Sequence, residues 1–61
     1  METSRAISIA EGLKEAKTHD EWVSAWQYLI NTGIVWELQG WFGRRATELI
    51  EENICHEASQ R

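Results

Sequence analysis

Residues 32–44 read TGIVWELQGWFGR, and this stretch decides how the chain folds. Gly33 can adopt the positive φ that ends a helix, so it predicts a boundary between two helices. Gly40 and Gly43 then fall inside the second of these helices, where each glycine costs about 1 kcal/mol relative to alanine. A chain of 61 residues has little stability to spare, so we expect another group to approach the helix backbone closely there.

The composition is that of one small domain, residues 1–61. Cys55 is the only cysteine, which excludes a disulfide within the chain and is typical of a reducing compartment. The net charge is −4, and acidic and basic residues are spread along the chain without the basic excess of a phosphate-binding protein. We find no signal peptide and no apolar run near the ~18 residues that span a membrane. We therefore expect a cytoplasmic protein with no membrane contact.

Apolar residues at helical spacing predict an all-α fold of three helices. The first covers about residues 4–16, and its apolar face consists of Ala6, Ile9, Ala10, Leu13 and Ala16. The second covers about residues 19–31 and begins at a capping box, in which Thr18 is the N-cap and Glu21 the third helical residue. The third covers about residues 34–52 and forms an αα-hairpin with the second. Residues 55–61 are polar, and we expect a frayed tail.

The predicted third helix carries two apolar stripes on roughly opposite sides. One consists of Ile34, Val35, Leu38, Phe42, Ala46 and Leu49, and the other of Trp36, Gly40, Gly43, Thr47 and Ile50. A helix with two stripes can pack against two surfaces at once. The alternative is that Gly40 breaks this segment into two short helices.

The glycines and tryptophans leave two interpretations open. Gly40 and Gly43 can form a shallow groove, walled by Trp36 and Ile50, that accepts a partner. Alternatively, they accommodate the first helix or a tryptophan of the same chain. Four tryptophans are many for a core this small, so we expect Trp36 and Trp41 at a partner surface. The alternative is that all four tryptophans lie in the core.

The charged residues favour structural roles. We expect Arg44 to pair with Glu48 one helical turn on, whereas Arg45 either forms a specific ion pair or extends its charged end into solvent. The segment around Gly40 and Gly43 lacks the lysine and hydroxyl residue of a phosphate-binding loop. The spacing of His19, Cys55 and His56 fits no zinc pattern. We therefore expect no catalytic residues, no metal, no cofactor and no enzymatic activity.

A family resemblance extends over about residues 21–54. Its residues are Trp26 to Gly33, then Val35-Trp36, Leu38-Gln39-Gly40, Gly43-Arg44, Ala46 and Leu49-Ile50. This pattern resembles a family of small proteins of tailed bacteriophages, most of them without an assigned function. The resemblance implies a phage protein in the cytoplasm of an infected bacterium. Small phage proteins of this kind commonly bind and redirect a host protein or neutralise a defence system.

These observations together predict a non-enzymatic protein that binds a host or phage protein and forms a homodimer. The expected partner-binding residues are Trp36, Gln39, Gly40, Trp41, Gly43, Arg44, Thr47 and Ile50. Two alternatives stay open. One is a small DNA-binding regulator of the helix-turn-helix type, which the acidic balance disfavours, and the other is a structural or assembly protein of the virion.

Overall fold

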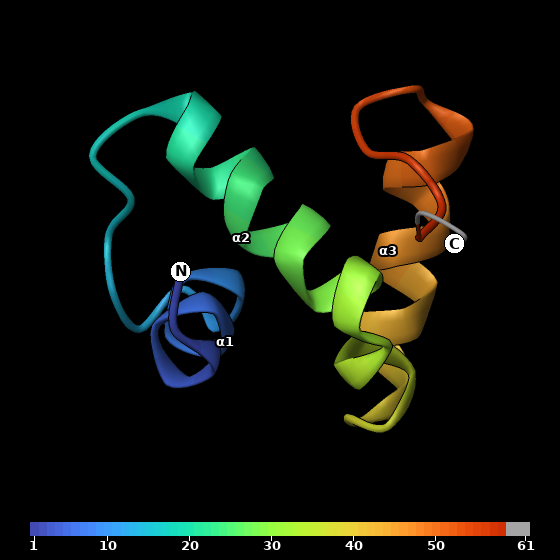
Figure 1. Ribbon diagram of the computed structural model, residues 1–61, viewed down its shortest axis with the longest axis horizontal. Helices are drawn as coiled ribbons and strands as arrows, with labels where there is room; N and C mark the ends of the chain where they lie inside the picture. Colours follow the sequence, from blue (N-terminus) through green and yellow to red (C-terminus); the bar gives the residue numbers. More distant parts are fainter. Residues whose placement is uncertain (59–61) are drawn as a thin grey trace.

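The computed structural model describes residues 1–58, which form three α-helices, one short 3₁₀ helix and no strand. The elements are α1 (Thr3–Glu11), α2 (His19–Thr32), η1 (Ile34–Trp36) and α3 (Gly40–Glu51). In Figure 1, α2 lies between α1 and α3, and η1 joins α2 to α3 at the bottom of the view. This arrangement confirms the predicted all-α fold, a helical hairpin with an additional N-terminal helix.

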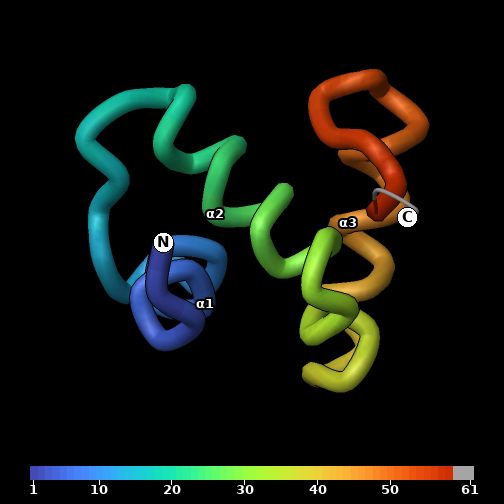
Figure 2. The backbone as a smooth tube through the Cα atoms, viewed as in Figure 1, coloured from blue at the N-terminus to red at the C-terminus, as the bar shows by residue number. Residues whose placement is uncertain are grey.

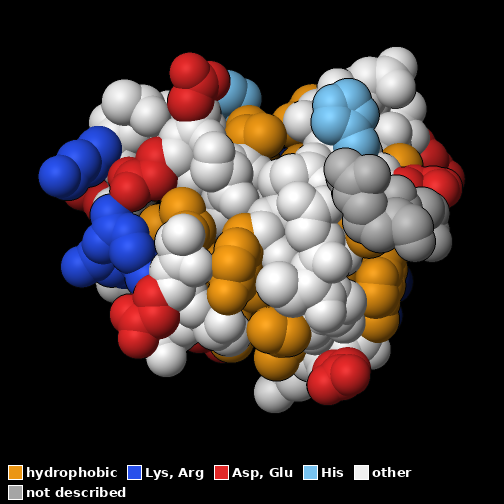
Figure 3. Space-filling view, in the orientation of Figure 1, with side chains coloured by type: hydrophobic (Ala, Val, Ile, Leu, Met, Phe, Trp, Pro, Cys, Tyr) orange, Lys and Arg blue, Asp and Glu red, His pale blue; other side chains and the backbone are white. Residues whose placement is uncertain are grey.

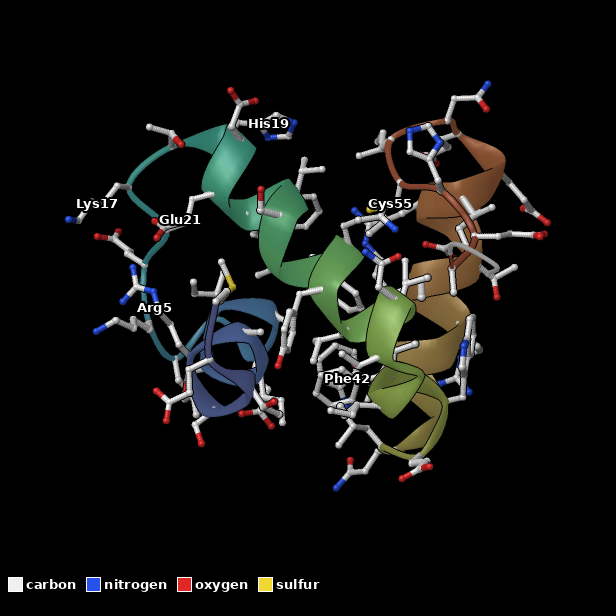
Figure 4. All side chains as sticks on the ribbon, viewed as in Figure 1. Arg5, Lys17, His19, Glu21, Phe42 and Cys55 are labelled. Carbon is white, nitrogen blue, oxygen red and sulfur yellow. The ribbon has the colours of Figure 1, made fainter. Side chains whose placement is uncertain are left out.

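The core lies where α1, α2, η1, α3 and the C-terminal segment meet. Trp26 is 1% exposed and its ring lies 6.0 Å from that of Phe42, centroid to centroid. These large rings fill the space between α2 and α3, and Phe42 points toward the middle of the molecule (Figure 4). The buried residues are Ala6, Ile9, Ala25, Trp26, Leu29, Ile30, Val35, Phe42, Ala46, Leu49 and Cys55.

The first helix is shorter than predicted because Gly12 ends it. Gly12 adopts φ 83°, and its N–H and that of Leu13 donate to the carbonyls of Ile9 and Ser8. This is the usual way in which a left-handed glycine closes a helix. The extension of this helix to Ala16 is therefore wrong, and Leu13, expected on its apolar face, is exposed.

The second helix has the predicted ends. The Thr18 Oγ1 accepts a hydrogen bond of 3.1 Å from the Glu21 N–H, as in a capping box. The Glu21 carboxylate accepts from the Lys17 N–H at 2.6 Å, one residue before the expected N-cap. Gly33 ends α2 with φ 80°, so the expected boundary is confirmed and α2 extends to Thr32.

A continuous third helix over residues 34–52 is wrong. η1 ends at Trp36, Gln39 has the extended ψ of 153°, and α3 begins at Gly40. The break buries Val35 and places Gly40 in the first turn of α3, where it does not weaken a helix interior. The alternative of a break near Gly40 therefore describes this segment correctly.

The C-terminal segment turns back along α3 (Figure 2). Asn53 adopts φ 64°, and the N–H groups of Ile54 and Cys55 donate to the Leu49 carbonyl. Cys55 is buried, and the Gln27 side chain exchanges two hydrogen bonds, of 2.9 and 2.8 Å, with the His56 backbone. The expected frayed tail is therefore wrong for residues 55–58, and residues 59–61 lie outside the described residues.

Polar contacts fasten α1 to α2. The Arg5 guanidinium forms an ion pair with the Glu21 carboxylate, and the two side chains face one another in Figure 4. The hydroxyls of Thr3 and Tyr28 lie 2.8 Å apart in the same first turn of α1. No helix in residues 1–58 is long and apolar enough to cross a membrane.

Candidate protein-binding site

The ring of Trp36 lies against Gly43 of α3. A Cβ built on Gly43 would lie 3.4 Å from Trp36 Cε3 and 3.6 Å from Cζ3. A methyl group at Gly43 would thus meet the ring in ordinary van der Waals contact, whereas there is no room for a larger group on the ring side. The group that approaches this glycine is a tryptophan of the same chain, so the intramolecular interpretation holds for Gly43.

Gly40 has a different environment. A Cβ there would lie 3.2 Å from Arg44 Nη1, which is the movable end of an exposed side chain. No backbone atom of another element of the described chain lies within 4 Å of that Cβ. Gly40 and Gly43 therefore do not form one groove. Gln39, Gly40 and Arg44 lie exposed at the N-terminal end of α3, and the Gln39 side chain makes no capping hydrogen bond.

A surface cleft of about 430 Å³ opens beside Trp36. We call it the Trp36 cleft, and it is lined by Ile30, Trp36, Thr47, Ile50, Glu51, Glu57 and Ala58. The structure brings three of the expected binding residues together here, namely Trp36, Thr47 and Ile50. Its far wall is the C-terminal segment, which folds back toward α3.

The sequence analysis missed Ile30, Glu51, Glu57 and Ala58 as members of this cleft. For Glu57 and Ala58 the cause was the expectation of a frayed tail, since that tail supplies one wall. Asn53 followed by Ile54 and Cys55 is the pattern that could have revealed the fold-back, because a left-handed residue followed by an apolar one is a common helix ending.

Trp41 belongs to a different surface. Nine residues on an α-helix make about two and a half turns, so Trp41 and Ile50 point in opposite directions from α3. The Trp41 ring stacks on Phe42 with centroids 3.9 Å apart and meets Trp26 edge-on at 6.4 Å. The expected partner-binding residues therefore divide between two sides of α3.

The four tryptophans differ in exposure as expected. Trp36 and Trp41 are 52% and 38% exposed, Trp22 is half-buried and Trp26 is buried. The alternative that all four lie in the core is therefore wrong. Trp36 has the largest exposed fraction, although its ring packs on Gly43.

The arginines reverse the predicted pairing. Arg45, not Arg44, forms the ion pair with Glu48, with 3.0 Å between Nη1 and Oε1. The guanidinium carbon of Arg45 also lies 5.9 Å from the centre of the Trp22 ring, which attracts a cation. Glu48 and the Trp22 ring therefore hold the Arg45 side chain in place. The Arg44 side chain instead extends toward Gly40.

Within residues 1–58, two titratable groups have a pKa that departs from its ordinary value. The Lys17 N–H and the Arg5 guanidinium bind the Glu21 carboxylate and lower its pKa. Burial raises the pKa of the Cys55 thiol, which disfavours the reactive thiolate. In Figure 3, Lys and Arg gather on the left, beside acidic side chains, and do not form a large basic patch on this face.

The fold and the cleft define a small all-α domain with an exposed aromatic surface. The chain belongs to the family described as Domain of unknown function (DUF7417), whose profile matches residues 6–60. No curated protein matches the chain. No solved structure matches it either.

Proposed function

We propose that this protein is a bacteriophage accessory protein that binds a host protein, without catalysis, in the cytoplasm of the infected bacterium. The observation that carries this proposal is Trp36, a half-exposed tryptophan held in place at the edge of the cleft. Tryptophans of this kind dominate the binding energy of protein interfaces. The consequence for the host protein is inhibition or redirection.

The support for Trp36 comes from its preorganisation. Its ring is seated on Gly43, so a partner need not restrict a freely moving side chain before contact. Binding is stronger when the interface is ordered beforehand, because less conformational entropy is lost. Trp41, which is stacked on Phe42, provides a second aromatic contact for a larger partner.

The DNA-binding alternative has less support. Arg44 and Arg45 are the basic residues of α3, and Arg45 is paired with Glu48. A helix that reads DNA needs several free basic and polar side chains on one exposed face.

A homodimer remains a prediction, and light scattering at increasing protein concentration tests it.

Affinity capture from a bacterial lysate tests the proposal, with tagged wild type, Thr47→Arg and Ser24→Arg compared. Thr47 lines the cleft, whereas Ser24 is exposed on α2 outside it, and both substitutions add the same charge. We expect wild type and Ser24→Arg to retain a host protein that Thr47→Arg loses, while circular dichroism shows all three folded. Equal retention by all three, or by none, contradicts the proposal.

A further inference from the structure

The Trp36 cleft is apolar at its base and acidic at its rim. Ile30, Ile50 and Ala58 supply aliphatic surface, and the Trp36 ring supplies an aromatic wall. Glu51 at the end of α3 and Glu57 of the returning segment are exposed carboxylates on the same cleft. An aromatic face beside two carboxylates is complementary to an organic cation.

These two carboxylates have no basic partner within residues 1–58. The ion pairs of that part of the chain are Arg5 with Glu21 and Arg45 with Glu48. Arg44, the other arginine of α3, extends toward Gly40 at the opposite end of the helix. The negative charge at the cleft is therefore available to a group from outside the described chain.

The end of α3 adds to this negative potential. The last turn contains no basic residue, and α3 ends at Glu51. The aligned peptide dipoles of a helix give its C-terminus a partial negative charge, which attracts cations. The partial charge of the helix end and the charges of Glu51 and Glu57 are thus both negative at the cleft.

We propose that the Trp36 cleft binds an arginine side chain of the partner protein. The guanidinium lies between Glu51 and Glu57, and its plane or its aliphatic stem covers the Trp36 ring. Arginine suits this cleft because its planar head stacks on aromatic faces and binds carboxylates through several N–H groups. The inference rests on the proposed binding function and specifies the chemistry of the partner.

The dimensions favour a side chain over a free small molecule. The volume of about 430 Å³ lies near the lower end of the ~300–1,000 Å³ of ligand pockets, which enclose most of the ligand. Here Thr47, Glu51 and Glu57 are exposed, so a bound group stays open to solvent on one side. A side chain projecting from a protein surface fits such an opening.

A nuclear magnetic resonance titration tests this inference with the peptide acetyl-Gly-Arg-Gly-amide at millimolar concentration. We expect shifts of the Trp36 indole N–H and of the Thr47 and Ile50 amides, which weaken as salt is added. The same peptide with citrulline in place of arginine has the same shape without the charge, and we expect no shifts. Equal shifts with both peptides, or none with either, overturn the inference.

Two double variants of equal net charge give the matched control. Glu51→Gln/Glu57→Gln removes the acidic rim, and Glu11→Gln/Glu15→Gln removes two exposed carboxylates elsewhere. We expect the first to weaken peptide binding about threefold or more and the second to leave it nearly unchanged. Equal weakening in both would mean general charge attraction and would overturn the inference.

The same variants separate this inference from the proposed function. A captured host protein that Thr47→Arg loses but Glu51→Gln/Glu57→Gln retains in full would leave the binding function intact and overturn the arginine assignment. The assignment is also overturned if the peptide binds only after Arg61→Gln, because the occupant is then the chain's own arginine. Trp36 shifts that depend on protein concentration without peptide would instead assign the cleft to a second copy.

Discussion

The Trp36 ring lies against Gly43, so close that a Cβ built on this glycine would be 3.4 Å from the Cε3 atom of the ring. This distance predicts different results for a small and a large substitution. Gly43→Ala fits in ordinary contact and removes a glycine from a helix interior, so we expect unfolding free energy to rise by up to about 1 kcal/mol. Urea denaturation measures this change.

Gly43→Leu should instead displace the Trp36 ring and alter the cleft. We expect tryptophan emission to shift to longer wavelength while the helical circular dichroism persists. Gly40→Leu is the matched control, since the nearest atom to its Cβ is the movable end of Arg44. The test is decisive in a chain whose only tryptophan is Trp36. If Gly43→Leu did not change the emission of that chain, the packing of Trp36 on Gly43 would be refuted.

The Gln27 side chain holds the returning C-terminal segment through its two hydrogen bonds to the His56 backbone. Cys55, the neighbouring residue, is 1% exposed. We expect Gln27→Ala to loosen this segment and to raise the rate at which a thiol reagent modifies Cys55, because reaction requires local opening. Gln39→Ala is the control, since Gln39 is exposed and far along the chain from Cys55. Equal rates in Gln27→Ala and wild type would contradict the clamp.

The Glu21 carboxylate predicts a pH dependence of stability. The Lys17 N–H and Arg5 lower its pKa in the folded chain below the ordinary value of 4.5. Its contribution is therefore complete above that value and decreases as the pH falls below 4.5 through the folded pKa. We expect Glu21→Gln to be less stable than wild type at neutral pH, and the difference to vanish at low pH. A difference that persists or grows in acid would show that these contacts do not act through the carboxylate charge. Glu11→Gln, which removes an exposed carboxylate elsewhere, is the control.

Substituting Gly12 or Gly33 should lower the unfolding free energy through backbone conformation alone. Both have positive φ, and a Cβ at either position meets nothing within 4 Å. We expect Gly12→Ala and Gly33→Ala each to reduce the unfolding free energy by about 1 to 2 kcal/mol. Thermal or urea unfolding checks this, with Gly40→Ala as the variant that lacks the conformational penalty. No loss in either variant would mean that the helix ends rearrange freely.

Local patterns predicted the helices and the cap of α2 because they depend on neighbouring residues. Thr18, Glu21 and Gly33 act within one helical turn, so the sequence alone places them. The end of the first helix was misplaced because a glycine within a periodic segment, here Gly12, can either weaken a helix or end it. The choice depends on whether the next apolar residue is buried, and Leu13 is exposed.

The cleft was only partly predictable because it depends on packing between distant segments. Periodicity placed Trp36 on one stripe with Thr47 and Ile50, and they do line the cleft, although an unwound turn brings Trp36 there. The contribution of Glu57 depends on the fold-back after Asn53 and on Gln27, 29 residues away from His56. A pairing at that separation leaves no mark in a local pattern.

Fluorine magnetic resonance of the 5-fluorotryptophan protein in bacterial host lysate tests the central claim most directly. Single Trp→Phe variants assign the signals of Trp22, Trp26, Trp36 and Trp41. We predict that the Trp36 signal shifts or broadens most in lysate and that Thr47→Arg, but not Ser24→Arg, abolishes the change. An unchanged Trp36 signal in lysate, with or without changes at the other three, would contradict the account.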